Sequence, residues 1–213
     1  MPLERGKMIS CSVSPFSTPK KTAFRLMRIS QVVAHYSEIR GGLLVHGALA
    51  EWNGMGVILA GPGGVGKTTA SERLPRRWRS LSDDTALIVL APDGTYWAHP
   101  WPTWSRLWQG DKPGSWDVQA AVKLSLICMM TQNKEDRLYG ISMRQAISEL
   151  VDVSGQTFAI LASGMDKGAL RHINLMRFQN AVALSKKVPV CRLELSRYGK
   201  FWQEIEKFLV SRR

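Results

Sequence analysis

The stretch GPGGVGKT at residues 61–68 constrains the fold and the chemistry of this chain more than any other part of its sequence. It fits the pattern G-x-x-x-x-G-K-[ST], in which the glycines allow a tight turn that points successive backbone N–H groups into one concavity. The apolar run MGVILA at residues 55–60 precedes it, and the helix-forming run TTASERL at residues 68–74 follows it. This order predicts a strand, a phosphate-binding loop and a helix whose N-terminus faces a bound phosphate group.

The motif assigns a nucleotide and a metal ion to this loop. The Lys67 ammonium is expected to reach the β and γ phosphates, and the Thr68 hydroxyl is expected to hold a magnesium ion. The predicted cofactors are therefore ATP and Mg²⁺. The simpler interpretation, a glycine-rich turn with an incidental lysine, requires every defining position and both flanks to agree by chance. The residues predicted to bind the cofactors are Gly61, Pro62, Gly63, Gly64, Val65, Gly66, Lys67, Thr68 and Thr69.

An acidic pair, Asp83 and Asp84, follows the predicted helix and opens the next strand. In ordinary P-loop enzymes the magnesium-binding aspartate ends a later hydrophobic strand, so this early position asks for another explanation. Two adjacent carboxylates beside a phosphate site can divide the chemistry between them. One orients a metal ion or its water, and the other accepts a proton from an attacking hydroxyl, which suits transfer onto an alcohol. The alternative is a pair of surface carboxylates that cap a turn.

The length of the chain, 213 residues, suffices for one α/β domain with a full core. Residues 1–21, rich in Ser, Pro and basic residues, are assigned to a flexible basic leader and residues 22–213 to one P-loop domain. Cys11, Cys128 and Cys191 lie far apart, which predicts neither a disulfide framework nor a zinc site and suits a reducing compartment. No uncharged apolar stretch approaches the ~20 residues that a bilayer span needs. The sequence therefore predicts a cytoplasmic protein with no membrane span.

The formal net charge of +12 raises nucleic acid, an anionic membrane or acidic substrates as partners. The basic residues are scattered, apart from the cluster RLPRRWRS at residues 73–80, and no recognisable nucleic-acid-binding module accompanies them. We therefore expect no nucleic acid partner. The cluster is either a solvated basic surface or a docking patch for an acidic peptide.

Hydrophobic patterns predict a mixed sheet around the phosphate-binding strand. Asn53-Gly54 predicts an antiparallel hairpin of strands at residues 43–51 and 55–60, which distinguishes the sheet from a purely parallel one. A second hairpin is predicted at residues 85–100, around the turn PDG, and a buried strand at residues 188–195. Helices are predicted at residues 117–130, with Asp117 as the N-cap, and at residues 142–151, 169–187 and 200–210. Residues 24–37 are predicted to form an edge strand that runs into a short helical turn.

The ordered set HGALAEWNGMGVILAGPGGVGKTTASERL at residues 46–74, followed by WRSLSDD at residues 78–84, resembles the catalytic core of the HPr serine kinase/phosphorylase family, which is itself similar to phosphoenolpyruvate carboxykinase. Later segments, such as AHPWPTWSRLW (residues 98–108) and VPVCRLELSRYGKFWQEI (residues 188–205), look like the stand-alone relatives found beside peptide-modification genes, particularly the ScmC protein of SynChlorMet cassettes. The resemblance implies a P-loop-containing mixed sheet of the HPr kinase/PEP carboxykinase type with a C-terminal helical section. It also implies a homo-oligomer.

The resemblance also implies roles for individual residues. Lys67 and Thr68 match the phosphate-binding and magnesium-binding positions of the family. His46 matches the histidine of an HG pair near the phosphate site, and Asp83 and Asp84 match the acidic pair, so that the resemblance implies a general base, here Asp83, and a metal-facing partner, Asp84. The bifunctional enzymes commonly read GDSGIGKSE where this chain reads GPGGVGKTT, so Pro62 and Thr69 stand where those enzymes carry acidic residues. The resemblance therefore extends neither to phosphorylase activity nor to HPr as the substrate.

A tryptophan-rich segment, YWAHPWPTWSRLW at residues 96–108, ends the second hairpin. Its rings can stack on adenine or grip an extended peptide, or they can simply cover the sheet. Arg106 within it is predicted to neutralise the transferring phosphoryl group. The candidate catalytic residues are therefore Asp83, Asp84, Lys67, His46 and Arg106, and the candidate metal ligands are Thr68 and Asp84.

These features together predict a kinase that uses ATP and Mg²⁺ to transfer the γ-phosphoryl group to a serine or threonine hydroxyl of a small protein or ribosomal peptide precursor. Two alternatives stay open. One is a nucleotide-dependent module that binds or matures a peptide without catalysis, which the loss of acidic residues around the loop favours. The other is a small-molecule kinase, which would need a compact anion pocket.

Overall fold

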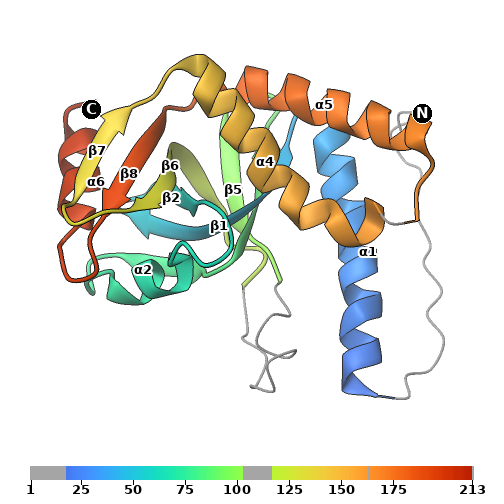
Figure 1. The fold of residues 1–213 in the computed structure, drawn as a ribbon, viewed down its shortest axis with the longest axis horizontal. Coiled ribbons are helices and arrows are strands. Elements are labelled where there is room, and N and C mark those ends of the chain that lie inside the picture. Colours follow the sequence, from blue (N-terminus) through green and yellow to red (C-terminus); the bar gives the residue numbers. More distant parts are fainter. Residues whose placement is uncertain (1–17, 103–116, 163, 213) are drawn as a thin grey trace.

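The computed structural model of the chain describes residues 18–102, 117–162 and 164–212. These residues form an α/β structure in which helices cover both faces of a mixed β-sheet, while one long helix stands at its end (Figure 1). The helices among them are α1 (Pro19–Ile39), α2 (Lys67–Arg73), α4 (Met143–Ala162), α5 (Lys167–Ser185) and α6 (Trp202–Val210).

The strands of the sheet follow the order β2-β1-β4-β5-β6-β8-β7, and β3 pairs with β1 outside this path. Because β2 also pairs with β6, the strands β2, β1, β4, β5 and β6 form a closed ring. The neighbours β2, β6 and β8 run parallel, so their carboxyl ends meet at one edge of the sheet. The strands are β1 (Leu43–Trp52), β2 (Met55–Ala60), β3 (Arg79–Ser82), β4 (Thr85–Leu90), β5 (Tyr96–Pro100), β6 (Val122–Gln132), β7 (Arg137–Gly140) and β8 (Val190–Leu195).

Both predicted hairpins are confirmed. Strands β1 and β2 pair antiparallel through Trp52 and Met55, and the two residues between them, Asn53 and Gly54, have φ angles of 49° and 77°. Two successive left-handed residues are what a two-residue hairpin of matching twist requires, which explains the Asn-Gly pair. Strands β4 and β5 form the second hairpin, also antiparallel.

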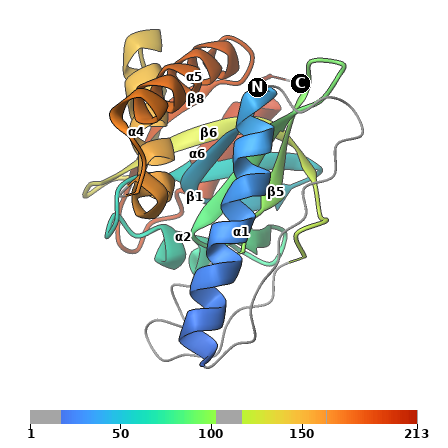
Figure 2. The same cartoon turned by 90° about the vertical axis from the view of Figure 1, so that its right-hand side faces the viewer.

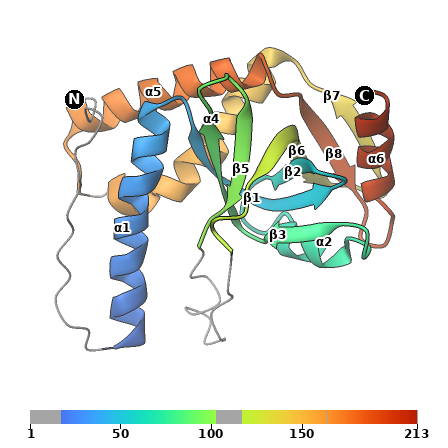
Figure 3. The ribbon, with the colours of Figure 1, turned by 180° about the vertical axis from the view of Figure 1, so that it is seen from behind.

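Alternate residues of the central strands face opposite sides of the sheet. Ile58 and Ala60 of β2 belong to the core cluster that includes residues of α4 and α5, whereas Val57 and Leu59 belong to the cluster that includes residues of α2 and α6. Figure 3 shows α5 along one side of the sheet and α2 along the other. Burial on both sides explains why β2 reads as a continuous apolar run rather than an alternating one.

The prediction of an edge strand at residues 24–37 is wrong, because these residues lie within α1. Thr18 caps the helix, since its hydroxyl accepts a hydrogen bond from the Lys21 amide, and Pro19 occupies the first turn, where its missing N–H costs nothing. The apolar residues of this stretch recur at three and four positions as well as at two, so the alternation is misleading. The helix also includes the last residues of the segment assigned to the leader.

Helix α1 is tied to α5 by a buried ion pair. The Arg177 guanidinium donates to both carboxylate oxygens of Glu38, at 2.8 and 3.2 Å, and the two side chains are 3% and 1% exposed. The Asn180 amide donates to the backbone oxygens of Glu38 and Gly42, at 2.7 and 2.9 Å. These bonds satisfy polar groups that burial would otherwise penalise, and they fix the end of α1 against α5.

The prediction of a helix at residues 117–130 is also wrong, because Val122–Gln132 forms β6. This strand pairs in parallel with β2 and β8, and its centre, residues 126–130, is apolar and buried because its alternate residues belong to the core clusters on the two faces of the sheet. A continuous apolar run cannot be distinguished from a buried helix by periodicity. Asp117 does not cap a helix; its carboxylate accepts a hydrogen bond from the Gln119 amide in a turn.

The helices predicted at residues 142–151, 169–187 and 200–210 are confirmed as α4, α5 and α6, although α4 continues to Ala162. Asp166 caps α5, since its carboxylate accepts from two amides of the first turn. None of the helices that the structure describes is both long and apolar enough to cross a membrane.

Candidate functional site

The glycine-rich loop, residues 61–66, connects the end of β2 to the start of α2. Gly64 and Gly66 have φ angles of 80° and 101°, a left-handed conformation that side chains other than glycine rarely adopt. A methyl group added at either position would meet no atom within 4 Å, so the loop has open space on the side that these glycines face. The predicted order of strand, loop and helix is therefore present.

Lys67 is the only cationic residue among residues 61–69, and its side chain lies against this loop. Its ammonium group donates to the carbonyl oxygens of Gly61 and Pro62, at 3.0 Å each, and its side chain is 5% exposed. Burial lowers the pKa of Lys67 below its usual value, and the negative charge of Asp84 opposes that shift. The ammonium is therefore largely out of water, with neutral carbonyl groups as its direct partners in the loop.

His46 lies between the loop and the acidic pair. Its Nδ1 is 3.4 Å from Oδ1 of Asp84, and its backbone oxygen accepts a hydrogen bond of 3.5 Å from the Gly61 amide. Burial lowers the pKa of His46, the carboxylate of Asp84 opposes the shift, and the ammonium of Lys67 adds to it. The pKa of the imidazole therefore depends on both the Lys67 ammonium and the Asp84 carboxylate.

Gly47, the second residue of the HG pair, permits a close approach of β1 and β2. A methyl group added there would lie 2.8 Å from Cγ2 of Ile58 and 3.2 Å from Cα of Ala60. Ala60 is the partner of Gly47 in the strand register and directly precedes the loop. The glycine thus allows the strand that carries His46 to lie against the strand that ends in the loop.

A tight turn presents the acidic pair. The Ser82 hydroxyl accepts a hydrogen bond from the Leu49 amide at 3.3 Å and donates to the backbone oxygen of Thr85 at 2.9 Å, which closes the chain around Asp83 and Asp84. Asp83 is 7% exposed, whereas the Asp84 side chain is 29% exposed and lies beside His46. The two carboxylates therefore occupy different environments, one buried and one accessible.

The structure brings most, but not all, of the predicted site residues together. Lys67, His46 and Asp84 interact, and Thr68 and Thr69 lie exposed on the first turn of α2. Among the described residues, no group of three or more His, Cys, Asp or Glu side chains is arranged to hold a metal ion. Arg106, Trp104 and Trp108 lie outside the described residues, whereas Trp101 is buried against Ala34, Leu44 and Leu87, and Trp97 is 37% exposed.

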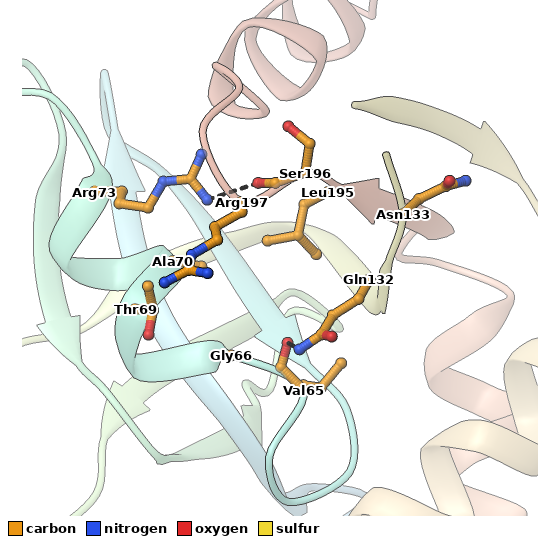
Figure 4. Close-up of a pocket in the computed structure, with 10 residues that line it drawn as sticks. All are labelled: Val65, Gly66, Thr69, Ala70, Arg73, Gln132, Asn133, Leu195, Ser196 and Arg197. Atoms are coloured by element: carbon orange, nitrogen blue, oxygen red, sulfur yellow. Dashed lines mark hydrogen bonds between the residues drawn. The ribbon is translucent and has the colours of Figure 1, made fainter. Parts of the chain in front are cut away.

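A pocket of about 390 Å³ lies beside the glycine-rich loop, and sequence reasoning missed it. In Figure 4 the Arg197 guanidinium extends over α2 toward Thr69, while Gln132 reaches from the end of β6 to the loop. The Gln132 amide donates to the backbone oxygens of Gly64 and Val65, at 3.4 Å each. The lining residues are Val65, Gly66, Thr69, Ala70, Arg73, Gln132, Asn133, Leu195, Ser196 and Arg197.

Arg73 of α2 orders one wall of this pocket. Its guanidinium donates to the backbone oxygen of Ser196 at 2.9 Å and also to that of Gly199, which fixes the loop between β8 and α6. Asp136 holds the same loop from the other side, since its carboxylate accepts from the Ser196 amide at 2.6 Å. The pocket therefore has walls that are held by hydrogen bonds rather than by loose side chains.

The position of the pocket follows from the sheet topology. Its lining comes from the segments that follow the carboxyl ends of β2, β6 and β8, the three parallel strands, and from the helix α2. Crevices outside the carboxyl ends of parallel strands are where α/β proteins commonly bind ligands. In the sequence, the polar residues Gln132 and Asn133 at the end of an apolar run are the sign of such a site. The prediction of a helix at residues 117–130 hid it, because no strand was expected to end there.

Comparison with known proteins finds a family model that matches most of the chain and curated relatives that match a short part of it. The family model described as SynChlorMet cassette protein ScmC matches residues 9–211. The HPr kinase/phosphorylases of three Streptococcus thermophilus strains are 40% identical over 57 residues, which is 26% of this chain. The match spans 18% of the length of these relatives, so it is a local similarity.

Proposed function

The chain belongs to the SynChlorMet cassette protein ScmC family, and we propose that it is a kinase that transfers the γ-phosphoryl group of ATP, with Mg²⁺, to a serine or threonine hydroxyl of a small protein or ribosomal peptide precursor. One observation carries the proposal: a buried lysine of a glycine-rich loop and the carboxylate of an adjacent turn share one histidine as a neighbour. The local similarity to HPr kinase/phosphorylases supports a kinase-like activity.

The loop residues fit a triphosphate. Lys67 is held by two backbone oxygens, Gly61 and Pro62, which are weaker partners for an ammonium group than phosphate oxygens are. We propose that the ammonium exchanges these partners for β and γ phosphate oxygens, while the amides of the loop and of the first turn of α2 bind the same groups. In this proposal the chain has the HPr kinase/PEP carboxykinase type of fold, and residues 61–68 are its P-loop.

Thr68 and Asp84 are the residues that would hold Mg²⁺. The Thr68 hydroxyl is exposed at the start of α2, and Asp84 presents a partly exposed carboxylate beside His46. Hydroxyl and carboxylate oxygens, completed by water and phosphate oxygens, are the ligands that Mg²⁺ prefers. A bound metal ion supplies charge neutralisation on the phosphates.

Asp83 is the residue to which we assign the general base. In the proposed step, the acceptor hydroxyl oxygen forms a bond to the γ-phosphorus, the bond from this phosphorus to the bridging oxygen breaks, and ADP leaves. The hydroxyl proton passes to the Asp83 carboxylate, which is 7% exposed and lies in the turn next to Asp84. His46, by contact with Asp84, would keep the metal-facing carboxylate in position.

The pocket beside the loop would hold the nucleoside. Its volume of about 390 Å³ is in the range of small-molecule sites, and it opens where a nucleotide would continue from phosphates bound at residues 63–67. Leu195 and Val65 offer apolar surface to a base, and Arg197 and Gln132 offer donors to a base or ribose. The same pocket would serve any nucleotide-dependent function of the chain.

Pro62 and Thr69 favour the alternative of a peptide-binding module without catalysis, because neither residue gives the loop a carboxylate. A kinase acting on a small molecule is the other alternative. The test is to incubate the protein with Mg-ATP and candidate precursor peptides that contain serine or threonine, and to measure the intact mass of each peptide. A gain of one phosphate supports the peptide kinase. ATP binding without transfer supports the module, and transfer in a metabolite screen supports the small-molecule kinase.

A further inference from the structure

An apolar stripe runs along the side of α1 that faces away from the sheet. Leu26, Val33 and Tyr36 are 39%, 54% and 37% exposed, and Ile29 is half-buried. These four residues are separated by three, four and three positions, the spacing at which side chains line one narrow face of a helix. Val32 and Ile39, 38% and 36% exposed, flank them. We call these six residues the outer stripe.

The opposite side of α1 is already packed against the rest of the protein, so the helix cannot bury the outer stripe by rotating about its own axis. Ala23, Ala34 and Glu38 are 1%, 2% and 1% exposed, and the Ser37 hydroxyl donates to the backbone oxygen of Ile88 in β4 at 3.3 Å. Figure 2, which views this end of the molecule, shows α1 in front with no other labelled helix or strand across it. The ion pair of Glu38 with Arg177 locks this orientation.

Positive charge borders the outer stripe. Lys21 and Arg28 belong to the same helix, and the guanidinium of Arg40, at its C-cap, lies 3.5 Å from the centre of the Tyr36 ring. Glu38 is the only acidic residue of α1, and it points inward to Arg177. A partner on this side therefore meets apolar side chains with the cations Lys21, Arg28 and Arg40 on the same helix or its C-cap, while the carboxylate of Glu38 is directed to Arg177.

We propose that the outer stripe is the docking site of an acidic amphipathic helix from a partner peptide or protein. The spacing of three, four and three positions suits a second helix packed against the stripe, because apolar residues repeat in this way along the seam between two helices. The like charges of two copies would oppose pairing of α1 with itself, whereas Glu and Asp side chains at the edges of a partner helix would pair with them. This inference does not depend on the proposed phosphoryl transfer.

The probe is a synthetic fluorescent peptide of about three heptads, with leucine at the three-four positions and glutamate beside them. Its binding to the full-length protein is measured by fluorescence anisotropy without nucleotide. The matched peptide has lysine in place of every glutamate. We expect the acidic peptide to bind, at least about tenfold more tightly than the lysine peptide, and to lose affinity as salt rises from about 50 to 500 mM.

Two variants locate the binding site. The double substitution Val33→Ser with Tyr36→Ser should weaken binding of the acidic peptide at least about tenfold, because it removes the centre of the stripe. Leu175→Ser, at a residue of α5 that is 55% exposed, is the matched control and should leave binding unchanged. Because all three side chains are exposed, the variants should keep the thermal unfolding midpoint of the unmodified protein.

Four results would overturn the inference. They are equal binding of the lysine peptide, absence of acidic-peptide binding, binding that the double substitution leaves unchanged, and a concentration-dependent dimer that the double substitution abolishes. In the last case the stripe is an interface between copies of the chain. Co-sedimentation with phosphatidylserine vesicles that requires Val33 and Tyr36, without peptide binding, would assign the stripe to a membrane surface instead.

Discussion

His46 and Asp84 approach to 3.4 Å between Nδ1 and Oδ1, although His46 lies in β1 and Asp84 lies in the turn between β3 and β4. His46 lies in β1 and is the register partner of Thr85, the first residue of β4, so the turn before β4 must bring Asp84 to the imidazole. The same histidine accepts a hydrogen bond from Gly61 through its backbone oxygen. The antiparallel pairing of β1 with both β2 and β4 therefore joins the glycine-rich loop to the acidic turn.

Replacing Lys67 should abolish tight nucleotide binding. Lys67→Ala removes the buried ammonium, and the loss of a charge-assisted contact to phosphate should weaken ATP binding by about 10- to 100-fold. Titration of a fluorescent ATP analogue measures this effect. Lys123→Ala, at an exposed lysine of β6, is the matched control. If both variants bind ATP as the unmodified protein does, the loop does not hold the phosphates.

The stability of the protein should fall in mild acid because of His46. Burial lowers the pKa of His46 in the folded state, so the unfolded state binds protons more readily. The contribution is fully present above the usual pKa of about 6.5 and is lost as the pH falls through the lowered value. Urea unfolding between about pH 8 and 5 should therefore show a shallower pH dependence for His46→Gln. An unchanged slope in this variant would show that other groups cause the loss.

Asp84→Asn should raise the Mg²⁺ concentration required for half-maximal activity by about tenfold or more, because an amide is a poorer ligand for this ion than a carboxylate. A magnesium titration at fixed ATP concentration measures the change. Asp152→Asn, at an exposed residue of α4, should leave the titration unchanged. The same midpoint in both variants would remove Asp84 from the metal site.

Arg73→Gln should distinguish the proposed nucleoside site from the proposed phosphate site. It removes the guanidinium that fixes Ser196 and Gly199, so we expect the free energy of unfolding to fall by about 1–3 kcal/mol and ATP to bind more weakly. Inorganic tripolyphosphate, which lacks a nucleoside, should bind as before. Calorimetric titrations with both ligands check this, with Arg76→Gln as the exposed control. Equal losses for ATP and tripolyphosphate would place the defect in the glycine-rich loop.

The buried pair of Arg177 and Glu38 should tolerate joint but not single replacement. Arg177→Leu alone leaves a buried carboxylate without its cation, which should lower the free energy of unfolding by about 3–5 kcal/mol. Adding Glu38→Leu should restore much of that loss. Chemical denaturation of the three proteins provides the measurement. A double variant as unstable as the single one would show that the pair itself stabilises the contact of α1 with α5.

Local chemistry made part of this structure predictable. The motif at residues 61–68 and the Asn53-Gly54 turn predicted a strand, loop, helix and hairpin, because the conformations of their glycines leave few alternatives. The family resemblance placed His46 near the phosphate site, but the contact of His46 with Asp84 was not predicted, since it depends on a register between distant strands. Residues that must pair across the sheet are not marked by any spacing in the sequence.

Other features depended on tertiary context. The centre of β6, residues 126–130, is apolar because it is buried on both faces of the sheet, and nothing local distinguishes that case from a buried helix. With β6 misassigned, Gln132 and the pocket at its end could not be placed. The apolar residues of α1 misled the prediction in the opposite direction, because several of them lie on the exposed side and gave the appearance of strand alternation.

The most direct measurement compares phosphoryl transfer by the unmodified protein, Asp83→Asn and Asp152→Asn. Each protein is incubated with Mg-ATP and the acceptor peptide, and the rate at which phosphorylated peptide forms is followed by intact mass, with ATP affinity determined in parallel. The account predicts that Asp83→Asn slows transfer by about 10²- to 10⁴-fold while it keeps its affinity for ATP, and that Asp152→Asn changes neither quantity. Transfer by Asp83→Asn at the rate of the unmodified protein would contradict it.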